Sequence, residues 1–303
     1  MKPINKIVIT FVFVLSFGLH GCYEEYTDDF DYLAVYFGEQ KPLRTLVTRT
    51  DQAELVFMIG ATIGGLRENL TGYDVEYELA PDLLTTVEGA NKLKLLPPNC
   101  YTIENDNNFT FHIPKGKIIG DCQVRINKNA FVALQGSLDA TWALPFRLLS
   151  TTADTILAAK NYTIIAIKYI DEHSGSYYCK GRELADTAGS NEVKYSNDDW
   201  SQNVVRVLTT LSPTAFDMAG MGTINDKIPA ADHLKINLEN GEVKLETRTN
   251  DTNIIEDLGS TYNADTKIFN LNYIYTKDAI NYTVNEQLKL RQDVEKELRF
   301  ETW

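Results

Sequence analysis

Hydrophobic and polar residues alternate with a period of two along most of the chain. In the first half, the alternation runs through residues 73–79, 109–113, 124–126 and 142–148. Because successive side chains of a strand point to opposite faces, each segment predicts a strand with one buried and one solvent-facing side. Pro145 cannot donate to a β-ladder, so we expect its strand at a sheet edge or at a bulge. One short helix is predicted over residues 81–90, and residues 32–170 as a whole are predicted to form a β-sandwich.

The second half repeats this alternation as a series of hairpins, over residues 234–238, 243–245, 269–275 and 280–284. Asn240-Gly241 lies between the first two segments and favours a type I′ turn, because this turn needs positive φ at both central residues. Consecutive hairpins without helices between them usually close on themselves, which removes exposed sheet edges. We therefore predict an up-and-down β-barrel over residues 171–303.

The fold class predicted for the whole chain is therefore all-β. The polar stretch 171–175 is the expected boundary between the sandwich and the barrel. Toward the C-terminus, residues 286–299 are compatible with a helical tail, but the last strand could equally continue through Leu290.

The first 22 residues have the features of an export signal and are excluded from the fold. An uncharged run over residues 7–19 follows two lysines and is too short to cross a bilayer. It ends in Leu19-His20-Gly21-Cys22, which resembles a bacterial lipobox. We predict a signal peptide over residues 1–21, acylation of Cys22 and an acidic tether over residues 22–31. An ordinary secretory signal with a chance cysteine is the alternative.

This leader predicts an outer-membrane protein that is held by its lipid anchor alone. Several acyl chains give stable anchoring without help from protein charge. The acidic residues that follow Cys22 resemble export signals that send some lipoproteins to the outer face of the outer membrane. We therefore expect the protein to face the cell exterior.

The charge balance narrows the choice of partners. The 303 residues include 29 Lys and Arg against 42 Asp and Glu, a net charge of −13. Nucleic-acid binding needs a basic face, and docking on an anionic membrane through protein charge needs one too, so neither is expected. With 44% hydrophobic residues the chain has ample apolar material for packed cores.

Metal, redox and catalytic motifs are missing from the sequence. The cysteines other than Cys22 have no C-x-x-C spacing, and we leave a Cys100–Cys122 disulfide open. The common nucleophile-elbow, P-loop, dinucleotide and zinc-protease motifs do not occur. We expect no enzyme activity, no cofactor and no metal site, and we expect solvent-exposed imidazoles at His112, His173 and His233.

Short segments in a shared order resemble the surface lipoproteins of Sus-type glycan-utilisation loci. In the first half these segments are LKLLPPNCYTI (93–103), IPKG (113–116) and LPF (144–146). In the second half they are SGSYY (174–178), YSNDDW (195–200), LTT (208–210), GSTYN (259–263), KIFNLNY (267–273) and VNEQL (284–288). The N-terminal domain of that family is immunoglobulin-like and also precedes some endo-β-N-acetylglucosaminidase domains, and its C-terminal domain is calycin-like, of lipocalin type.

The resemblance implies a glycan-handling role at the cell surface, with an oligosaccharide as ligand and an outer-membrane transporter complex as a further partner. The family is largely uncharacterised, so the resemblance assigns no functional residue and no glycan identity. Two functions stay open. One is a non-catalytic glycan-binding accessory protein, and the other is a structural or assembly lipoprotein whose barrel binds a protein or a small hydrophobic ligand.

One loop has the residue types that sugar binding needs. A flat aromatic can stack on the apolar face of a pyranose while planar polar groups bind its hydroxyls. Trp200 follows a polar run at a strand entrance, with Tyr195, Asp198 and Asp199 in the same loop. These four residues are the predicted glycan site, at the rim of the barrel. The alternative is that Trp200 caps the core of the barrel.

Overall fold

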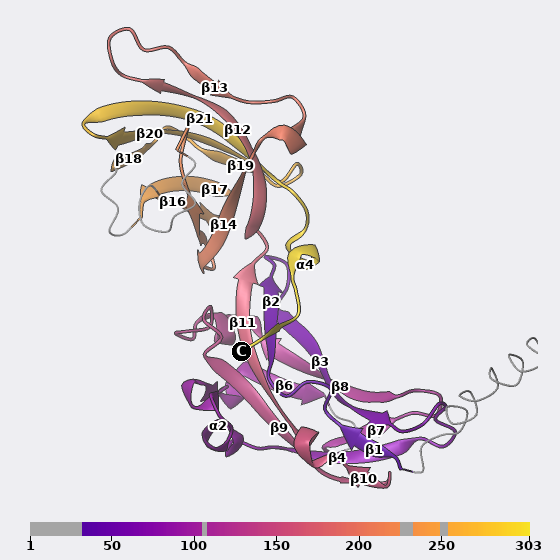
Figure 1. Cartoon of the computed structure of the whole chain (residues 1–303). Helices are drawn as coiled ribbons and strands as arrows, with labels where there is room; N and C mark the ends of the chain where they lie inside the picture. Colours follow the sequence, from indigo (N-terminus) through magenta and orange to yellow (C-terminus); the bar gives the residue numbers. More distant parts are fainter. Residues whose placement is uncertain (1–31, 105–107, 225–232, 249–253) are drawn as a thin grey trace, which may run out of the picture.

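The computed structural model describes residues 32–104, 108–224, 233–248 and 254–303. The predicted signal peptide, Cys22 and the tether lie outside the described residues. The chain is all-β, with a two-sheet sandwich followed by a closed barrel (Figure 1). Within the described residues, no helix has the length and apolar character to span a membrane.

Two curled sheets form the sandwich. The first has the strand order β10 (Thr155–Ile156), β1 (Ala34–Tyr36), β3 (Glu54–Gly64), β8 (Ile119–Asn127) and β6 (Tyr101–Glu104). The second has the order β22 (Glu301–Thr302), β2 (Pro42–Thr48), β11 (Tyr162–Asp171), β9 (Trp142–Thr151), β4 (Tyr73–Leu79) and β7 (Thr110–Ile113), with β5 (Lys94–Leu95) also paired to β9. The predicted alternating segments of the first half thus lie in strands.

Short helical pieces connect the strands of the sandwich. The helix expected over residues 81–90 is reduced to α2 (Leu83–Thr86) and the 3₁₀ turn η2 (Ala90–Lys92). The other pieces are η3 (Pro98–Cys100), α3 (Lys128–Val132) and η4 (Ala158–Lys160).

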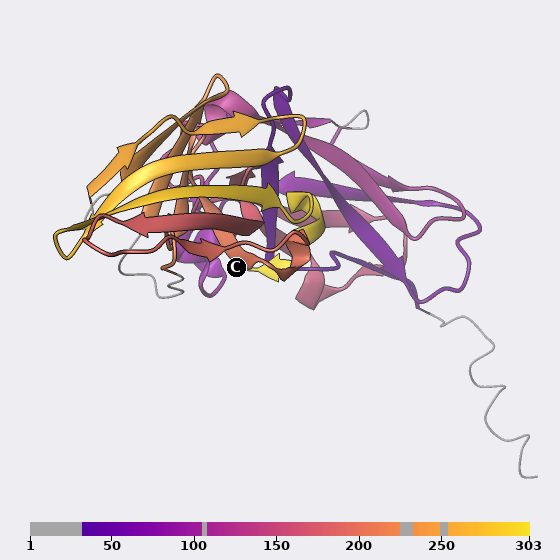
Figure 2. The same cartoon turned by 90° about the horizontal axis from the view of Figure 1, so that it is seen from above.

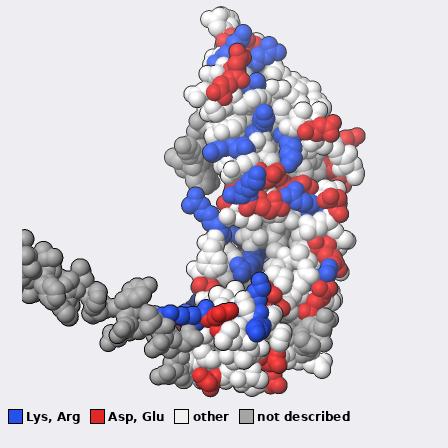
Figure 3. Space-filling model, turned by 90° about the vertical axis from the view of Figure 1, so that its right-hand side faces the viewer, with Lys and Arg blue, Asp and Glu red and all other residues white. Residues whose placement is uncertain are grey.

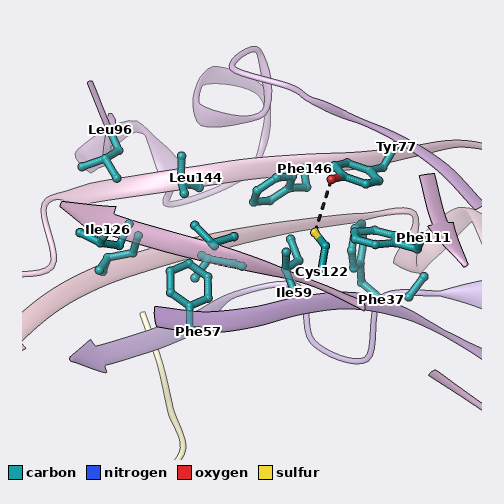
Figure 4. Close-up of a cluster of buried hydrophobic side chains, with 14 of the residues drawn as sticks. Phe37, Phe57, Ile59, Tyr77, Leu96, Phe111, Cys122, Ile126, Leu144 and Phe146 are labelled. Carbon is teal, nitrogen blue, oxygen red and sulfur yellow. Dashed lines mark hydrogen bonds between the residues drawn. The ribbon is translucent and has the colours of Figure 1, made fainter. Parts of the chain in front are cut away.

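Aromatic rings fill the space between the two sheets (Figure 4). Tyr77 from β4 stacks on Phe111 from β7, with ring centroids 4.0 Å apart, and Phe37 meets Phe111 edge-on at 6.2 Å. The hydroxyl of Tyr77 lies 3.4 Å from Sγ of Cys122, which belongs to the facing sheet. The side chains that the alternation placed inward are therefore the ones that join the two layers.

Of the two positions expected for Pro145, the sheet edge was wrong, because its strand β9 lies inside the sheet between β11 and β4. The strand is irregular, as the other expectation had it, since the register of β9 on β4 shifts between Leu148 and Ser150. Pro145 faces Ile164, whose own N–H points away to bond the carbonyl of Gln40 at 2.8 Å. The ladder between β9 and β11 therefore needs no donor from the proline. On its other side β4 ends at Leu79, and the Pro145 carbonyl accepts from the N–H of Ala80 at 3.0 Å.

The barrel is antiparallel and closed. Its strands are β12 (Gly175–Ala185), β14 (Val204–Ser212), β15 (Ala215–Ala219), β16 (His233–Glu239), β17 (Glu242–Thr247), the interrupted strand β18 (Ile254–Asp257) with β19 (Thr261–Asn263), β20 (Ile268–Lys277) and β21 (Ile280–Leu290). β21 pairs with both β20 and β12 and so closes the circle (Figures 1 and 2). Neighbours in space are neighbours in sequence, which confirms the predicted up-and-down topology.

A short strand, β13 (Val193–Tyr195), extends beyond the barrel on β12, and the 3₁₀ turn η5 (Trp200–Gln202) leads from it into β14. The predicted hairpin at Asn240-Gly241 is confirmed, with φ of 52° and 84° at its two residues. The last strand continues through Leu290, as one of the two expectations for the C-terminal segment had it.

The C-terminal tail returns from the barrel to the sandwich. After α4 (Val294–Glu297), β22 pairs antiparallel with β2, and Trp303 lies against the sandwich (Figure 1). Arg49 joins both Glu172, at 3.2 Å, and Glu295 of α4. The last residues, which the sequence placed with the barrel, thus bind the first domain.

Candidate functional site

A polar surface covers the outside of three neighbouring barrel strands, β12, β21 and β20. Two rungs cross these strands at successive outward positions. Lys180 faces Gln287, which faces Asn270, while Arg182 faces Asn285, which faces Asn272. We call these six residues the amide face.

Hydrogen bonds within each rung fix the planes of the amide groups. The Gln287 amide donates to Oδ1 of Asn270 at 2.8 Å. In the other rung, Asn285 donates to Oδ1 of Asn272 at 2.9 Å, and Nε of Arg182 donates to Oδ1 of Asn285 at 3.2 Å. A side-chain amide carries two donors and an acceptor oxygen with two lone pairs, so these bonds leave hydrogen-bonding capacity in each rung.

The loop that follows β13 forms one wall of a groove of about 440 Å³ above the amide face. Asn203 holds the loop, because its side-chain amide donates to the carbonyls of Asn197, Asp199 and Trp200 at 2.9–3.2 Å. Asp199 caps η5 by accepting from the N–H of Ser201 at 2.9 Å. The loop therefore has a fixed shape, and Asp198 presents an exposed carboxylate along the groove.

Trp200 lies on the outside of the barrel, half-buried, beside the groove. The ammonium groups of Lys180 and Lys289 lie 4.1 and 5.5 Å from the centroid of its ring. Both lysines project outward from β12 and β21, so the indole rests on the outer face of these strands. The alternative in which Trp200 caps the barrel core does not match this position, because the ring takes no part in the buried cluster.

Two of the predicted site residues serve the structure of the loop and barrel. Tyr195 points to the interior, where its hydroxyl donates to Oε2 of Glu286 at 2.9 Å. Burial, with the nearby Glu286 carboxylate, raises the pKa of Tyr195 well above its ordinary value. Tyr195 fits there because it faces Gly181, where an added Cβ would lie 2.8 Å from its hydroxyl. Asp199 is engaged in capping η5, so Trp200 and Asp198 are the two of the four predicted residues that remain open to a ligand.

The chain itself fills the interior of the barrel. The turn after β15 folds inward, burying Met221, and its backbone is held by buried charges. Arg206 donates to the carbonyls of Gly222 and Ile224, at 2.7 Å each, and Glu183 accepts from the N–H of Thr223 at 2.9 Å. A lipocalin-like ligand in the barrel would have to displace this turn.

Of the three expected solvent-exposed histidines, His233 is buried and His173 is half-buried instead. His112 is exposed and pairs with Asp74 at 2.7 Å. His173 packs edge-on against Tyr262, with centroids 5.0 Å apart, because the turn between β11 and β12 folds against the end of the barrel. His233 is buried, with Nδ1 2.9 Å from the Asp217 carboxylate.

The described residues contain no group of three or more His, Cys, Asp or Glu that could hold a metal ion. Cys100, Cys122 and Cys179 are buried free thiols, so the disulfide that the sequence left open does not form.

A second hollow, of about 960 Å³, lies between the two domains. Arg49, Lys128 and Glu172 contribute to its walls from one side, and Phe216 and Tyr262 from the barrel. Its lining mixes charges of both signs with aromatic rings. The amide face differs from this hollow, because its similar amide side chains lie side by side on paired strands.

The sequence interpretation missed the amides of β20 and β21. A signal for them exists, since two successive outward positions on each strand carry amides, Asn270 and Asn272 on β20 and Asn285 and Gln287 on β21. Adjacent outward amides on paired strands were recognisable only once the register was known.

Comparisons with known proteins agree with this architecture. The model of an N-terminal-domain family matches residues 27–155, which is less than half of the chain. No curated protein matches the sequence. A Bacteroides ovatus protein of unknown function shares the fold at a TM-score of 0.68 and 19% identity, over 86% of this chain and 95% of its own.

Two further solved structures are similar at lower scores. An auxiliary nutrient binding protein from Bacteroides thetaiotaomicron has a TM-score of 0.38 and 10% identity, over 84% of this chain and 92% of its own. A Bacteroides ovatus protein described as a candidate carbohydrate binding protein has a TM-score of 0.34 and 13% identity, over 70% of this chain and 66% of its own. These relatives are described as binding proteins or as proteins of unknown function.

Proposed function

We propose that this protein is a non-catalytic, glycan-binding accessory protein of a polysaccharide-utilisation system, and that the amide face binds the glycan. The observation that carries the proposal is the pair of hydrogen-bonded rungs, in which planar side chains from three strands lie side by side and Lys180 of the same surface contacts the ring of Trp200. A sugar ring offers hydroxyls that both donate and accept. Amide and guanidinium groups held in fixed planes can meet these hydroxyls in pairs.

The rigidity of the surface supports binding without a deep pocket. The amides stand on paired strands and are already oriented by one another, so little side-chain freedom remains to be lost on binding. The groove is also open to solvent along the outside of the barrel, which suits a chain of sugars better than a single small molecule. The filled barrel interior argues against the other reading, in which the barrel takes a small hydrophobic ligand.

Anchoring is part of the same proposal. Acylation of Cys22 would fix the protein to the outer membrane, and the sandwich would hold the barrel outward, near an outer-membrane transporter complex. Replacing Cys22 by alanine should release the protein from membranes and abolish labelling by radioactive palmitate. Unchanged membrane association of this variant would contradict the anchor.

The test of glycan binding is a glycan-array screen of the soluble protein that starts after Cys22, followed by calorimetry on the best ligand. Asn285→Ala removes an amide that bonds to both Asn272 and Arg182, and binding should weaken about 3- to 10-fold, the scale of one or two lost hydrogen bonds.

Asn237→Ala is the matched control, since Asn237 lies on β16, across the barrel, and donates to the carbonyl of Lys244. Equal affinity of the two variants for a bound glycan would remove the amide face from the proposal. A failure to bind any glycan would reject the function.

A further inference from the structure

Positive charge gathers around the amide face, although the whole chain is acidic. Lys180, Arg182 and Lys194 line the groove, and Lys289 and Arg291 continue the row along and just after β21. The chain as a whole has a net charge of −13. Figure 3 shows basic side chains clustered over the barrel in the upper part of the view.

Few carboxylates neutralise this row. Glu192 alone serves both Arg182, at 3.4 Å, and Lys194, at 3.7 Å. Within the described part of the chain, no ion pair joins a carboxylate to Lys180 or Lys289, and both ammonium groups lie over the ring of Trp200 instead.

The two other acids at the groove change this balance little. Asp198 is exposed at its edge. Glu286 contributes to the lining but directs its carboxylate into the barrel, where the hydroxyls of Tyr273 and Tyr195 bind it. The groove therefore has more cations than anions facing it.

Arg182 can bind an anionic ligand group while it stays hydrogen-bonded to the amide face. Its Nε donates to Asn285, and Nη1 faces Glu192 at a long 3.4 Å. A guanidinium has five N–H donors in one plane, so both donors on Nη2 and the second donor on Nη1 are left for a ligand. Paired donors of this geometry suit the two oxygens of a carboxylate or sulfate.

We propose that the amide face is selective for acidic glycans, whose uronate or sulfate groups bind Lys180 and Arg182 while their hydroxyls bind the amides. This inference rests on the proposed function and names its ligand class. The negative charge over the rest of the chain would repel polyanions from other surfaces and so favour this groove.

The experiment compares matched glycans by calorimetry on the soluble protein. The acidic probes are oligogalacturonate and chondroitin sulfate, and the neutral counterparts are the same chains after carboxyl reduction or after desulfation and carboxyl reduction. Polyglutamate of similar charge serves as an anion without sugar hydroxyls. At least one acidic glycan should bind about tenfold more tightly than its neutral counterpart. The difference should shrink between about 50 mM and about 500 mM NaCl, because salt screens exposed charges.

Charge variants locate the effect. Lys180→Gln with Arg182→Gln should weaken acidic-glycan binding about tenfold and reduce the preference over the neutral chain. Lys244→Gln is the control for the loss of a surface cation elsewhere on the barrel. Lys244 is 73% exposed on β17, across the barrel, and pairs with Glu246. Its binding should match the parent protein.

Three results would overturn the inference. Neutral chains could bind as tightly as acidic ones, polyglutamate could bind as tightly as the acidic glycan, or the double variant could keep full affinity. The first of these would leave the proposed function standing, because glycan binding itself would persist. Binding of no glycan at all, acidic or neutral, would reject the proposed function and this inference with it.

Discussion

Replacing Trp303 by alanine should destabilise the sandwich and leave the barrel intact. The indole Nε1 donates to the carbonyl of Ile164 at 2.6 Å. The half-buried ring packs against a small apolar cluster around α2 and η2, and the ammonium groups of Lys41 and Lys92 lie 5.1 and 5.5 Å from its centroid. Trp303 is thus an anchor that the barrel's tail places on the first domain.

The magnitude follows from these contacts. A half-buried Trp removes about 100 Å² of apolar surface from water, which at about 25 cal/mol per Å² contributes about 2.5 kcal/mol. The indole hydrogen bond adds about 1 kcal/mol, and two exposed cation–π contacts add about 0.5 kcal/mol each. These contributions add to about 4.5 kcal/mol. We therefore expect the free energy of unfolding of the sandwich to fall by about 3–5 kcal/mol, the range of such truncations.

Urea unfolding can assign this loss to one domain, because each domain carries its own second tryptophan. Trp142 lies in β9 of the sandwich, and Trp200 lies on the barrel. In a Trp303→Ala background, Trp200→Phe leaves fluorescence from the sandwich alone, and Trp142→Phe leaves fluorescence from the barrel. The Trp142 signal should shift to lower urea, while the Trp200 signal should keep its midpoint.

Phe300→Ala is the matched control, since Phe300 belongs to the same tail but is 62% exposed. It should change either midpoint little. A Trp303→Ala sandwich within about 1 kcal/mol of the parent would refute the anchor. An equal shift of both signals would show that the two domains unfold as one unit.

Three other predictions test the site loop and the buried groups. Trp200→Ala should weaken glycan binding by about 1–3 kcal/mol on the scale of aromatic stacking, with the denaturant midpoint little changed because the ring lies outside the core; a large stability loss with unchanged affinity would contradict this. Thiol reagent should leave the folded soluble protein unlabelled, because burial raises the pKa of the described thiols, and should label all of them in denaturant. Burial raises the pKa of Tyr169 and Tyr262 to about 12 from an ordinary 10. Their stabilising contribution is therefore full below pH 10 and should be lost as pH rises through 12. Urea midpoints and tyrosinate absorbance measured against pH should show this loss, and Tyr169→Phe should reduce the slope of the urea midpoint against pH.

The strands and the topology could be predicted from the sequence because their causes are local. Alternation reports which face of a strand is buried, and Asn240-Gly241 fixes a turn by its backbone preference. The predicted edge position of Pro145 failed because ladder bonds depend on which neighbour faces each residue. The return of Trp303 to the sandwich could not be predicted from the alternation either, because β22 has only two residues and is held by tertiary contacts.

The site could be predicted only in part, for a related reason. The loop over residues 195–200 was identified by composition, but the direction of each side chain depends on its partners. Tyr195 turns inward because Gly181 leaves room beneath it, and Asp199 turns back on its own backbone. Trp200 lies half-buried on the outer face of the barrel, outside the core cluster, and Asp198 is exposed at the groove.

The positions that break the alternation explain why a ligand would bind outside this barrel. Glu183, Arg206 and Glu286 stand where the pattern calls for apolar residues, and burying such charges is costly unless they are paired. Glu286 accepts from the hydroxyls of Tyr195 and Tyr273, while Arg206 and Glu183 bind an inward turn. The glycines of this turn allow close approach, since a Cβ at Gly220 would lie 1.9 Å from Arg206 and one at Gly222 would lie 1.9 Å from Glu183. The polar interior thus binds mainly the protein's own backbone and tyrosine hydroxyls, whereas the amide face presents hydrogen-bonding groups to the outside of the barrel.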